Sequence, residues 1–418
     1  MTTDVIVIGG GPAGMAAAVA AAENGASVIL LEKNAKLGMK LNLTGRGRCN
    51  VTNRADTAGF QAKIWRNPKF VLGSLHRFSP DDLEQFLASH GLRLKEEDSG
   101  RMFPITDRAS DVTKTFRRAL KEAGVQIETE TAATALIRRS DGFLVRTTAE
   151  PYRSRSVVLA AGGLSYPSTG STGDGFAMAK TAGHSIIPLQ AALVGFESDM
   201  QDLRALSGLT LKGIDFTLLE GGRVLAREEG ELLFTRFGVS GPAVFRASCA
   251  VPAGAGYPLT GIIDLKPRLS QEELERRIVD LGSREPNKEV RTVLEGLMPR
   301  RLTGPVCEQA DTAPRQRMNQ LSREQRRRLA VAIKGLQIRI TSLRPVSEAI
   351  ITSGGIPVSE INPKTMESRL VPGLFFAGEM IDVSAMTGGY NLQIAFSTGW
   401  DAGRSAAAYC AAAAGPQN

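Results

Sequence analysis

A glycine-rich turn between an apolar run and an alanine-rich stretch constrains this chain more than any other feature. The segment DVIVIGGGPAGMAAAVAAAENGASVILLEK, residues 4–33, predicts a buried strand over Val5–Ile8, a helix over Met15–Glu23 and a second strand over Ser27–Leu31. The continuous β-branched run of the first strand is typical of a parallel strand that is covered on both faces. The sequence therefore predicts an α/β fold that begins with a Rossmann-type βαβ unit.

The turn itself carries the spacing Gly9-x-Gly11-x-x-Gly14 that dinucleotide sites require between a strand and a helix. The first glycine permits the tight turn, the second lets backbone approach a pyrophosphate, and the third lets helix and strand pack closely. Glu32, at the end of the second strand, is placed to accept hydrogen bonds from ribose hydroxyls. The residues expected to contact a dinucleotide here are Gly9, Gly11, Pro12, Ala13, Gly14, Glu32 and Lys33. This part of the chain leaves NAD and FAD open.

A second glycine turn near the C-terminus favours FAD. The segment LFFAGEMIDVSAMTGGYNLQ, residues 374–393, predicts an apolar strand, a Gly-Glu pair and a glycine turn that opens a helix. The free N–H groups at such a helix N-terminus suit the pyrimidine end of a flavin, which becomes negative on reduction, whereas a simple NAD dehydrogenase has no use for them. The expected contacts are Gly378, Glu379, Asp382, Gly388, Gly389, Tyr390, Asn391 and Leu392.

Changes in glycine content and in the pattern of strands and helices divide the chain into three stretches. Residues 1–190 and 344–418 are glycine-rich and α/β in pattern, whereas residues 191–343 have short strand-like runs followed by arginine-bearing helical stretches. We therefore expect one nucleotide-binding domain interrupted by an inserted α+β substrate domain. Within the first stretch, residues 125–158 alternate like an antiparallel ribbon with a turn at residues 140–142.

The net charge of +8 is concentrated in the insertion. Residues 290–344 hold twelve Lys or Arg against four acidic residues, so this segment accounts for the whole net charge. We interpret the basic helices as an RNA-binding surface that would neutralise phosphates, although a solvated helix face and a dock for a nicotinamide dinucleotide phosphate stay open. No aromatic residues are interleaved, so specificity would come from RNA shape and from extrusion of a base. The candidate contacts are Arg300, Arg301, Arg323, Arg326, Arg327, Arg328 and Lys334.

Several classes of protein are disfavoured by what the sequence lacks. The four cysteines, at positions 49, 249, 307 and 410, form no CxxC pair, so we expect neither disulfides nor a metal site, and a cytoplasmic location. We expect no membrane association, because no segment is typical of a transmembrane span or a signal peptide. The three histidines stand alone, and we assign none of them chemistry. The oligomeric state stays open.

Several blocks resemble the BaiN/RdsA family of FAD-dependent NAD(P)H oxidoreductases over nearly the whole chain, from Asp4 to about Arg404. They are TGRGRCNVTN, GRMFPITDRASDV, ELLFTRFGVSGPAV, ITSGGI, TMESRLVPGLFFAGEMIDV and TGGYNLQIAFSTG. The resemblance implies a glutathione-reductase-like FAD domain and reduction of a conjugated C=C bond. The implied substrate is a uridine of 23S ribosomal RNA, which becomes dihydrouridine, or else a small enone such as a 3-oxo bile acid. A flavin-containing RNA-binding protein without dedicated catalysis is a further alternative. No second GxGxxG exists, so NAD(P)H is expected to bind transiently over the flavin.

The resemblance also places the loop TGRGRCNVTN, residues 44–53, beside the flavin. Arg48 is expected to face the phosphates or the flavin, and Asn50 to bond polar ring atoms. Cys49 is either a proton donor to the substrate or a small contact beside the cofactor. Tyr390 and Tyr166 either line the substrate face or belong to the core. Where the family is expected to have a histidine, this chain has Arg236, a permanent cation that cannot act as a general acid. The remaining expected FAD contacts are Lys40, Gly45, Arg46, Gly47, Ala133, Ala161, Gly162, Gly173 and Asp174.

Overall fold

The structure is a computed structural model that describes residues 2–413. Residue 1 and residues 414–418, which the sequence analysis assigned to the two ends of the nucleotide-binding domain, lie outside the described residues. The chain forms two compact units. Unit 1 comprises residues 1–191 and 346–418, and unit 2 comprises residues 192–345. Each unit has its own cluster of buried apolar side chains.

The main sheet of unit 1 is a Rossmann-type sheet. Its strand order is β7-β2-β1-β10-β9-β8, and β20 also pairs with β10. Strands β7, β2, β1, β10 and β20 run parallel, whereas β8 and β9 form an antiparallel hairpin that continues onto β10. The strands are β1 (Thr2–Ile8), β2 (Val28–Leu31), β7 (Gln126–Glu128), β8 (Ala133–Arg139), β9 (Gly142–Thr147), β10 (Tyr152–Leu159) and β20 (Leu374–Phe376). The predicted Rossmann-type α/β fold is confirmed.

One expectation about this sheet is corrected. Residues 126–128 do not belong to the antiparallel ribbon, because they form β7, which lies parallel to β2 at the edge of the main sheet. Only β8 and β9, with the predicted turn at residues 140–142, and β10 form the ribbon. A strand of three residues has too few side chains for its sequence to show which strand it pairs with. Its position beside β2 is set by the tertiary structure.

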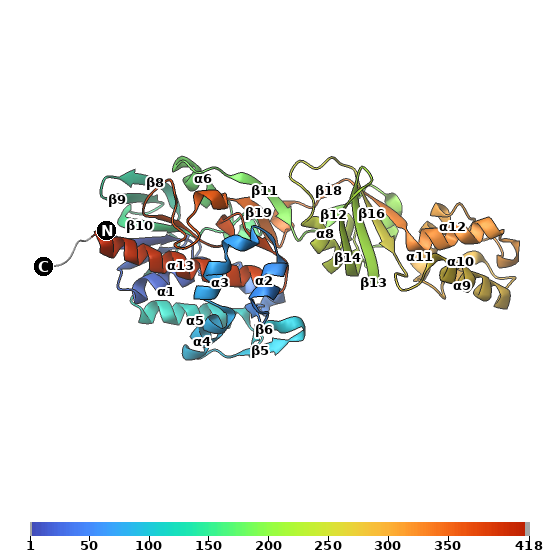
Figure 1. Ribbon diagram of the computed structural model, residues 1–418, viewed down its shortest axis with the longest axis horizontal. Helices are drawn as coiled ribbons and strands as arrows, with labels where there is room; N and C mark the ends of the chain where they lie inside the picture. The colour runs from blue at the N-terminus through green and yellow to red at the C-terminus, as the bar shows by residue number, and fades with distance from the viewer. Residues whose placement is uncertain (1, 414–418) are drawn as a thin grey trace. The chain divides into compact units, whose positions relative to one another are not determined.

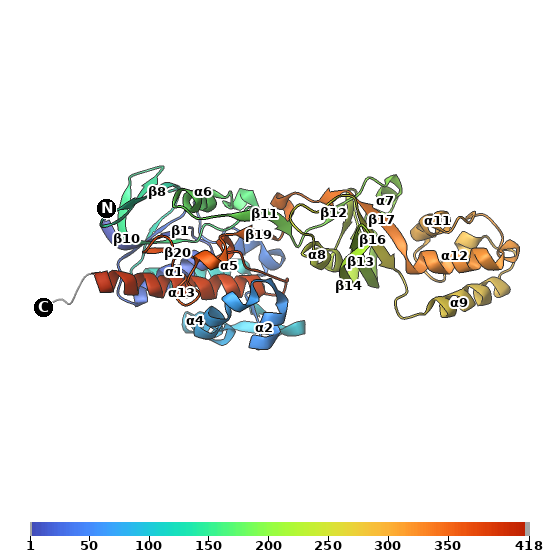
Figure 2. The same cartoon turned by 45° about the horizontal axis from the view of Figure 1, so that its top comes forward.

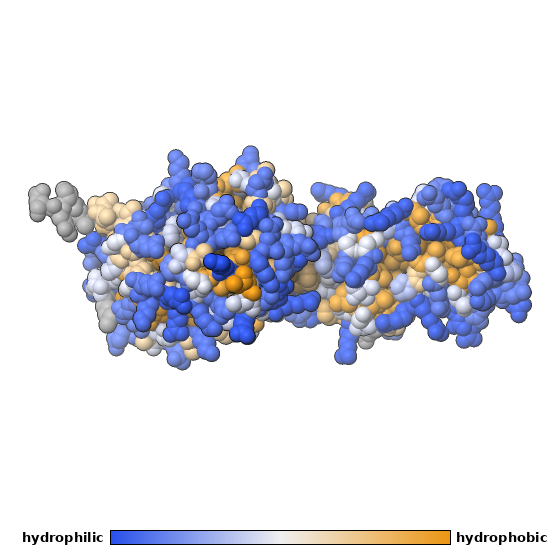
Figure 3. All heavy atoms as spheres, turned by 90° about the horizontal axis from the view of Figure 1, so that it is seen from below, coloured by the Kyte–Doolittle hydropathy of each residue, from blue (hydrophilic) through white to orange (hydrophobic). Residues whose placement is uncertain are grey.

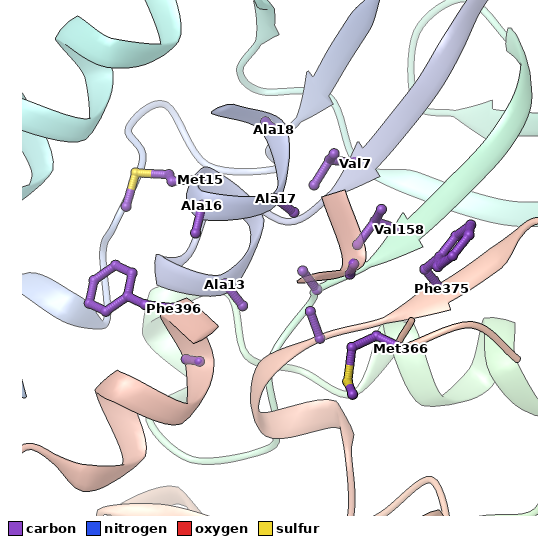
Figure 4. Packing of buried hydrophobic residues seen from close by; sticks show 14 of the residues in the cluster. Val7, Ala13, Met15, Ala16, Ala17, Ala18, Val158, Met366, Phe375 and Phe396 are labelled. Carbon is purple, nitrogen blue, oxygen red and sulfur yellow. The ribbon is translucent and has the colours of Figure 1, made fainter. Parts of the chain in front are cut away.

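Two helices with small side chains pack against each other beside the parallel strands. Helix α1 (Pro12–Glu23) connects β1 to β2, and α13 (Tyr390–Ala413) lies beside it in both Figure 1 and Figure 2. Figure 4 shows the alanines of α1 close to Phe396 of α13 and to strand residues Val7 and Val158. A Cβ added at Gly399 or Gly403 of α13 would lie 2.1 or 2.0 Å from a carbonyl oxygen of α1. The two backbones are therefore in direct contact.

The other elements of unit 1 surround this core (Figure 2). Small sheets pair β3 and β5 with β6, β4 with β21, and β11 with β19. The helices are α2 (Thr57–Lys63), α3 (Leu72–Arg77), α4 (Pro80–Ser89), α5 (Ala109–Glu122) and α6 (Asp174–Thr181). The strands are β3 (Thr52–Asn53), β4 (Ile64–Arg66), β5 (Leu94–Glu97), β6 (Arg101–Pro104), β11 (Ile187–Ala192), β19 (Ile351–Gly355) and β21 (Ser384–Ala385).

Unit 2 combines an antiparallel sheet with six helices among its described elements. The sheet has the strand order β17-β16-β13-β14-β15-β12-β18. Its strands are β12 (Phe196–Glu197), β13 (Thr210–Glu220), β14 (Arg223–Phe234), β15 (Gly238–Ser240), β16 (Leu259–Asp264), β17 (Leu336–Ile340) and β18 (Ser342–Leu343). The longer helices are α8 (Pro242–Ser248), α9 (Gln271–Arg284), α11 (Arg300–Gln309) and α12 (Arg323–Lys334), and α10 (Val290–Leu294) and α7 (Gln201–Ala205) are single turns. Figure 3 shows mostly hydrophilic side chains, with apolar atoms visible over the helical part of this unit.

Among residues 2–413, the helices are each too short or too polar to cross a lipid bilayer.

Candidate functional site

The two glycine turns, almost 380 residues apart in sequence, line one cavity of about 530 Å³ in unit 1. Gly11 of the first turn and Asn391 of the second are both among its lining residues. Every lining residue belongs to unit 1. The predicted cofactor contacts that line it are Gly9, Gly11, Pro12, Ala13, Glu32, Lys33, Lys40, Gly45, Arg46, Asn50, Ala133, Ala161, Gly162, Asp174, Gly378, Glu379, Gly388, Gly389, Asn391 and Leu392.

Glycine is needed at each position of the first turn for a different physical reason. A Cβ at Gly9 would lie 2.5 Å from the Ala160 carbonyl oxygen, and one at Gly14 only 1.8 Å from the Gly9 carbonyl oxygen, so these two positions are closed by packing. A Cβ at Gly11 would meet no protein atom within 4 Å, so its open side faces the cavity. Gly11 is also the N-cap of α1, and no side chain caps the free N–H groups that follow it. This geometry suits a bound phosphate.

Glu32 is a fixed, buried carboxylate at the carboxyl end of β2. Its Oε2 accepts a hydrogen bond from the Gly10 amide at 2.8 Å, and its Oε1 accepts from the backbone and side-chain nitrogens of Asn34 at 2.8 and 2.7 Å. The donors hold the carboxylate in one orientation while it still lines the cavity. Each oxygen keeps lone pairs for further donors such as ribose hydroxyls.

The loop over residues 40–50 brings two cations to the cavity. Lys40 forms an ion pair with Glu379 at 2.7 Å, and the other oxygen of Glu379 accepts a hydrogen bond from the Thr352 amide at 2.7 Å. Arg46 has a left-handed backbone, φ +58°, and its exposed side chain lines the cavity. Its guanidinium has no ion pair or hydrogen bond with the described residues. Arg46 is therefore available to a ligand.

Asn50 gives the clearest sign of a missing partner. Its side-chain oxygen is buried and has no hydrogen-bond partner among the described residues, although Asn50 lines the cavity. An unsatisfied buried acceptor costs about 1–3 kcal/mol. A ligand that donates an N–H to this oxygen, such as the polar edge of a flavin ring, would remove that cost.

Arg48 does not lie where the sequence led us to expect it. Its guanidinium does not face the cavity; it forms ion pairs with Glu97 and Asp107, and it lies 4.3 Å from the centre of the Phe103 ring. Arg48 lowers the pKa of the Glu97 carboxyl mainly through its hydrogen bond. Because both acids come from segments far from residue 48 in sequence, local spacing did not indicate them. Gly47 also lies outside the cavity lining.

The expected roles of Cys49 and Tyr390 at the site are also wrong. Cys49 is fully buried and absent from the cavity lining, and burial raises the pKa of its thiol to about 12. A thiol without access to the cavity cannot deliver a proton to a substrate there, so the packing alternative stands. Tyr390 is 6% exposed, and its ring meets the edge of Phe60 at 4.9 Å between centroids. It belongs to the core and lies outside the cavity lining.

Three further predicted contacts support the site from outside the lining. Asp382 is buried and binds the side chains of Arg66 and Asn67, so its carboxylate holds two elements of unit 1 together. Gly14 lets α1 pack on the first turn, as described above. Gly173 has φ +88° and precedes α6, so it shapes the turn behind Asp174. The side chain of Asn391 is likewise occupied, because it bonds the backbone of Ala385 and Met386.

The sequence analysis did not assign several polar residues that line the cavity. Tyr166, considered only as a substrate-face or core residue, lines it with a left-handed backbone, φ +54°. Thr352 accepts hydrogen bonds from the amides of Leu164 and Ser165 at 2.7 and 3.1 Å, so it fixes the turn before Tyr166. The quoted block ITSGGI contains Thr352, and its glycines were the available indication. The other unassigned polar lining residues are Asn34, Thr44, Thr131, Thr169, Ser171 and Thr387.

His184 also has a role that sequence did not reveal. It is buried, and its two ring nitrogens lie 2.7 Å from a carboxylate oxygen of Glu360 and 2.8 Å from the hydroxyl oxygen of Ser368. Burial is the largest effect on this ring, and it lowers the pKa of His184. His184 is outside the cavity lining, so these contacts join α6 to the segment that leads to β20. Among the described residues, no group of histidine, cysteine and acidic side chains is arranged to hold a metal ion.

In unit 2, the cations predicted to bind RNA fall into two groups. Arg301 donates to the carbonyls of Ala205 and Ser207, and Lys334 pairs with Asp264 at 2.7 Å. These two side chains therefore hold the fold. The ion pairs of Arg300 with Glu295 and of Arg327 with Glu324 are long, at 3.6 and 4.0 Å. The partners of the others are Leu321 for Arg326 and Asp311 for Arg328, and Arg323 is exposed.

Arg236, where the resemblance leads us to expect histidine, lies in the turn between β14 and β15 of unit 2 and is exposed. It makes no hydrogen bond or ion pair with the described residues.

Comparison with known proteins identifies the family. The family model described as HI0933-like protein Rossmann domain matches residues 3–405. The chain belongs to this family. It is 32% identical over 406 residues to the 3-dehydro-bile acid delta(4,6)-reductase of Clostridium scindens, covering 96% of this chain and 98% of the relative. It is 29% identical over 400 residues to the ribosomal RNA dihydrouridine synthase of Escherichia coli, covering 95% and 96%. This chain is therefore an FAD-dependent oxidoreductase, and the predicted cofactor FAD is confirmed.

The fold is also similar to that of solved flavoenzyme structures. The 3-ketosteroid delta1-dehydrogenase of Sterolibacterium denitrificans has a TM-score of 0.54 at 15% identity, over 97% of this chain and 99% of that one. At this identity the likeness concerns the fold alone. The residues present fit FAD on the evidence of this structure: an uncapped helix at Gly11, a fixed carboxylate at Glu32 and an unpartnered acceptor at Asn50.

Proposed function

We propose that this FAD-dependent reductase transfers hydride from NAD(P)H to an electron-poor C=C bond, and that its substrate is a uridine of 23S ribosomal RNA. One observation carries the proposal: a single cavity joins the uncapped helix at Gly11, the second glycine turn and the unpaired Arg46. When bound, FAD would supply the two-electron chemistry needed to reduce the carbon that is β to a carbonyl group. The neighbouring carbon then takes a proton.

The residues of the cavity would bind and orient the reactants. The free N–H groups after Gly11 would bind the pyrophosphate, Glu32 would accept from a ribose hydroxyl, and Asn50 would accept from a ring N–H. Arg46 would stabilise the negative charge that develops on the carbonyl oxygen of uracil or an enone. It is suited to this because its guanidinium is not bound to a carboxylate of the protein.

The proton requires a group other than Cys49. Tyr166 lines the cavity, and its hydroxyl has no hydrogen-bond partner among the described residues. We propose Tyr166 as the donor to the carbon beside the reduced position. A Tyr166→Phe variant should keep its FAD content and lose about 100- to 10,000-fold in the rate of acceptor reduction. Full acceptor turnover in this variant would exclude the role.

Two observations support RNA as the substrate class. The relatives from E. coli and Haemophilus influenzae that are named ribosomal RNA dihydrouridine synthases are 29% and 30% identical to this chain over nearly its full length. The whole net charge of +8 is carried by residues 290–344. A small enone is the second candidate, because the C. scindens relative named for a bile acid is 32% identical.

The test uses the purified, FAD-loaded protein without oxygen. NAD(P)H should bleach the flavin absorbance, and a 23S ribosomal RNA lacking dihydrouridine should restore it, with a mass increase of one uridine by two hydrogens. A host strain without the gene should lose that dihydrouridine. Reoxidation by a steroid enone and not by RNA would select the second candidate. Failure of NAD(P)H to bleach the flavin would favour an RNA-binding protein without dedicated catalysis.

A further inference from the structure

The helical part of unit 2 contains an open depression of about 550 Å³ that is separate from the flavin cavity. It lies where α10, the first turns of α11 and the segment before α12 meet, and α10 packs against α11 (Figure 1). Its lining residues are Arg291, Glu295, Arg300, Thr303, Gly304, Ala313, Pro314 and Arg315. Three of the eight carry a permanent positive charge, and one carries a negative charge.

The three arginines have donors that the protein does not use. Arg315 is exposed and has no hydrogen bond or ion pair with the described residues. The side chain of Arg300 is 82% exposed, and its Nε lies 3.6 Å from Glu295, beyond hydrogen-bond distance. Arg291 binds Glu289 through its Nε at 2.6 Å, which leaves its two terminal amino groups. By contrast, Arg301 and Lys334 are occupied by backbone carbonyls.

The backbone around the depression is fixed by hydrogen bonds. The amide of Arg291 donates to the Pro314 carbonyl at 3.0 Å, and the amide of Val290 donates to the Gln316 carbonyl at 2.8 Å. The segments that carry Arg291 and Arg315 are thereby tied together. Gly304 lines the depression, and a Cβ added there would meet no atom of another element within 4 Å. The backbone positions of Arg291 and Arg315 are therefore fixed beside the depression.

We infer that this depression binds phosphate groups of an RNA backbone. The inference rests on the proposed RNA substrate and names where unit 2 holds it. Guanidinium groups match phosphate oxygens in geometry and charge, and their excess over Glu295 favours an anion. The lining has no aromatic ring on which a base or nicotinamide would stack, so phosphate is the group that this chemistry recognises.

The test compares two variants of the full-length, FAD-loaded protein. One changes Arg291, Arg300 and Arg315 to Gln, and the control changes three exposed arginines of α9, namely Arg276, Arg277 and Arg284, to Gln. Both variants lose three charges from unit 2. Binding of a fluorescently labelled 23S ribosomal RNA fragment is measured by fluorescence anisotropy at salt concentrations from about 0.05 to about 0.3 M. This range lies on both sides of the physiological ionic strength of about 0.15 M.

Each lost phosphate contact on a single strand lowers the slope of log affinity against log salt by about 0.7, or about fivefold in affinity at 0.1 M salt. The depression variant should therefore bind RNA about 100-fold more weakly, with a slope smaller by about 2, while the α9 variant changes several-fold less. The single change Arg315→Gln, which removes no hydrogen bond or ion pair with the described residues, should lower RNA affinity about fivefold. Tripolyphosphate should compete with RNA on the wild type and the α9 variant.

Equal RNA affinity in the wild type and the depression variant would refute the site while leaving the RNA substrate intact. No RNA binding by the wild type would instead refute the RNA substrate, and the inference with it. Equal losses in the two triple variants would show a diffuse charge effect and also refute the site. Flavin bleaching by NAD(P)H should be unchanged in all variants, because none of the substituted residues lines the flavin cavity.

Discussion

The contact between α1 and α13 predicts how a single methyl group should affect both stability and FAD binding. In Gly399→Ala, the new Cβ would lie 2.1 Å from the Ala13 carbonyl oxygen, whereas real Cβ contacts essentially never fall below 3.0 Å. The two helices would have to separate by about 0.9 Å, and a gap of that size forfeits a quarter to a half of each dispersion contact between them. We expect overpacking to cost about 3–4 kcal/mol, above the usual range of about 1–3 because the new Cβ meets backbone, and to be offset by about 1 kcal/mol of helix propensity.

The net loss of about 2–3 kcal/mol should lower the melting temperature of unit 1 by about 5–10 °C, as measured by calorimetry on the apoprotein. Gly403→Ala should cost a similar amount, because its Cβ would lie 2.0 Å from the Ala17 carbonyl oxygen. The two variants should differ in FAD binding. Ala13 lines the flavin cavity and Ala17 does not, so Gly399→Ala should weaken FAD about tenfold and Gly403→Ala less.

Gly304→Ala in α11 is the matched control, because its Cβ would meet no atom of another element within 4 Å. This variant should change stability by no more than about 1 kcal/mol, because the gain in helix propensity is opposed by crowding against the Pro305 ring that follows. If Gly399→Ala melted at or above the wild-type temperature, the close backbone contact between α1 and α13 would be refuted. Equal FAD affinity in the Gly399 and Gly403 variants would refute the link between that contact and the phosphate turn.

Three further predictions concern single side chains of unit 1. Asn50→Ala should raise the FAD dissociation constant about 5- to 10-fold in a fluorescence titration, without destabilising the apoprotein, because its oxygen has no protein partner; unchanged FAD affinity would argue against the contact. Cys49→Ala should keep acceptor turnover, and the native thiol should resist thiol reagents at pH 8, because a pKa of about 12 leaves it protonated; rapid labelling of Cys49 would contradict its burial. Burial lowers the pKa of His184, so below about pH 6.5 this side chain is protonated in the unfolded chain but stays neutral in the folded protein. The free energy of unfolding should therefore fall between pH 7 and 5 in urea melts, and His184→Gln should flatten that fall; an equal fall in both proteins would exclude His184 as its source.

Local sequence was sufficient wherever short-range geometry fixes the outcome. The spacing of Gly9, Gly11 and Gly14 allows one kind of strand-to-helix turn, because a Cβ at the first and third positions would overlap backbone oxygens. The apolar runs over residues 5–8 and 27–31 predicted two strands of a parallel sheet, and β1 and β2 are parallel neighbours. Local chemistry also explains where α4 begins, because the Ser79 side chain caps its first turn and Pro80 follows.

Only the tertiary structure decided which side chains face the cavity. Arg48 and Arg46 are two residues apart in the same loop, yet Arg48 binds Glu97 and Asp107 while Arg46 stays unpaired beside the cavity. The acids that make this difference come from β5 and the segment after β6, so no local pattern in the loop contains them. Backbone turns are set by neighbours along the chain, whereas the partner of a charge is set by whichever distant segment the fold brings within a few ångströms.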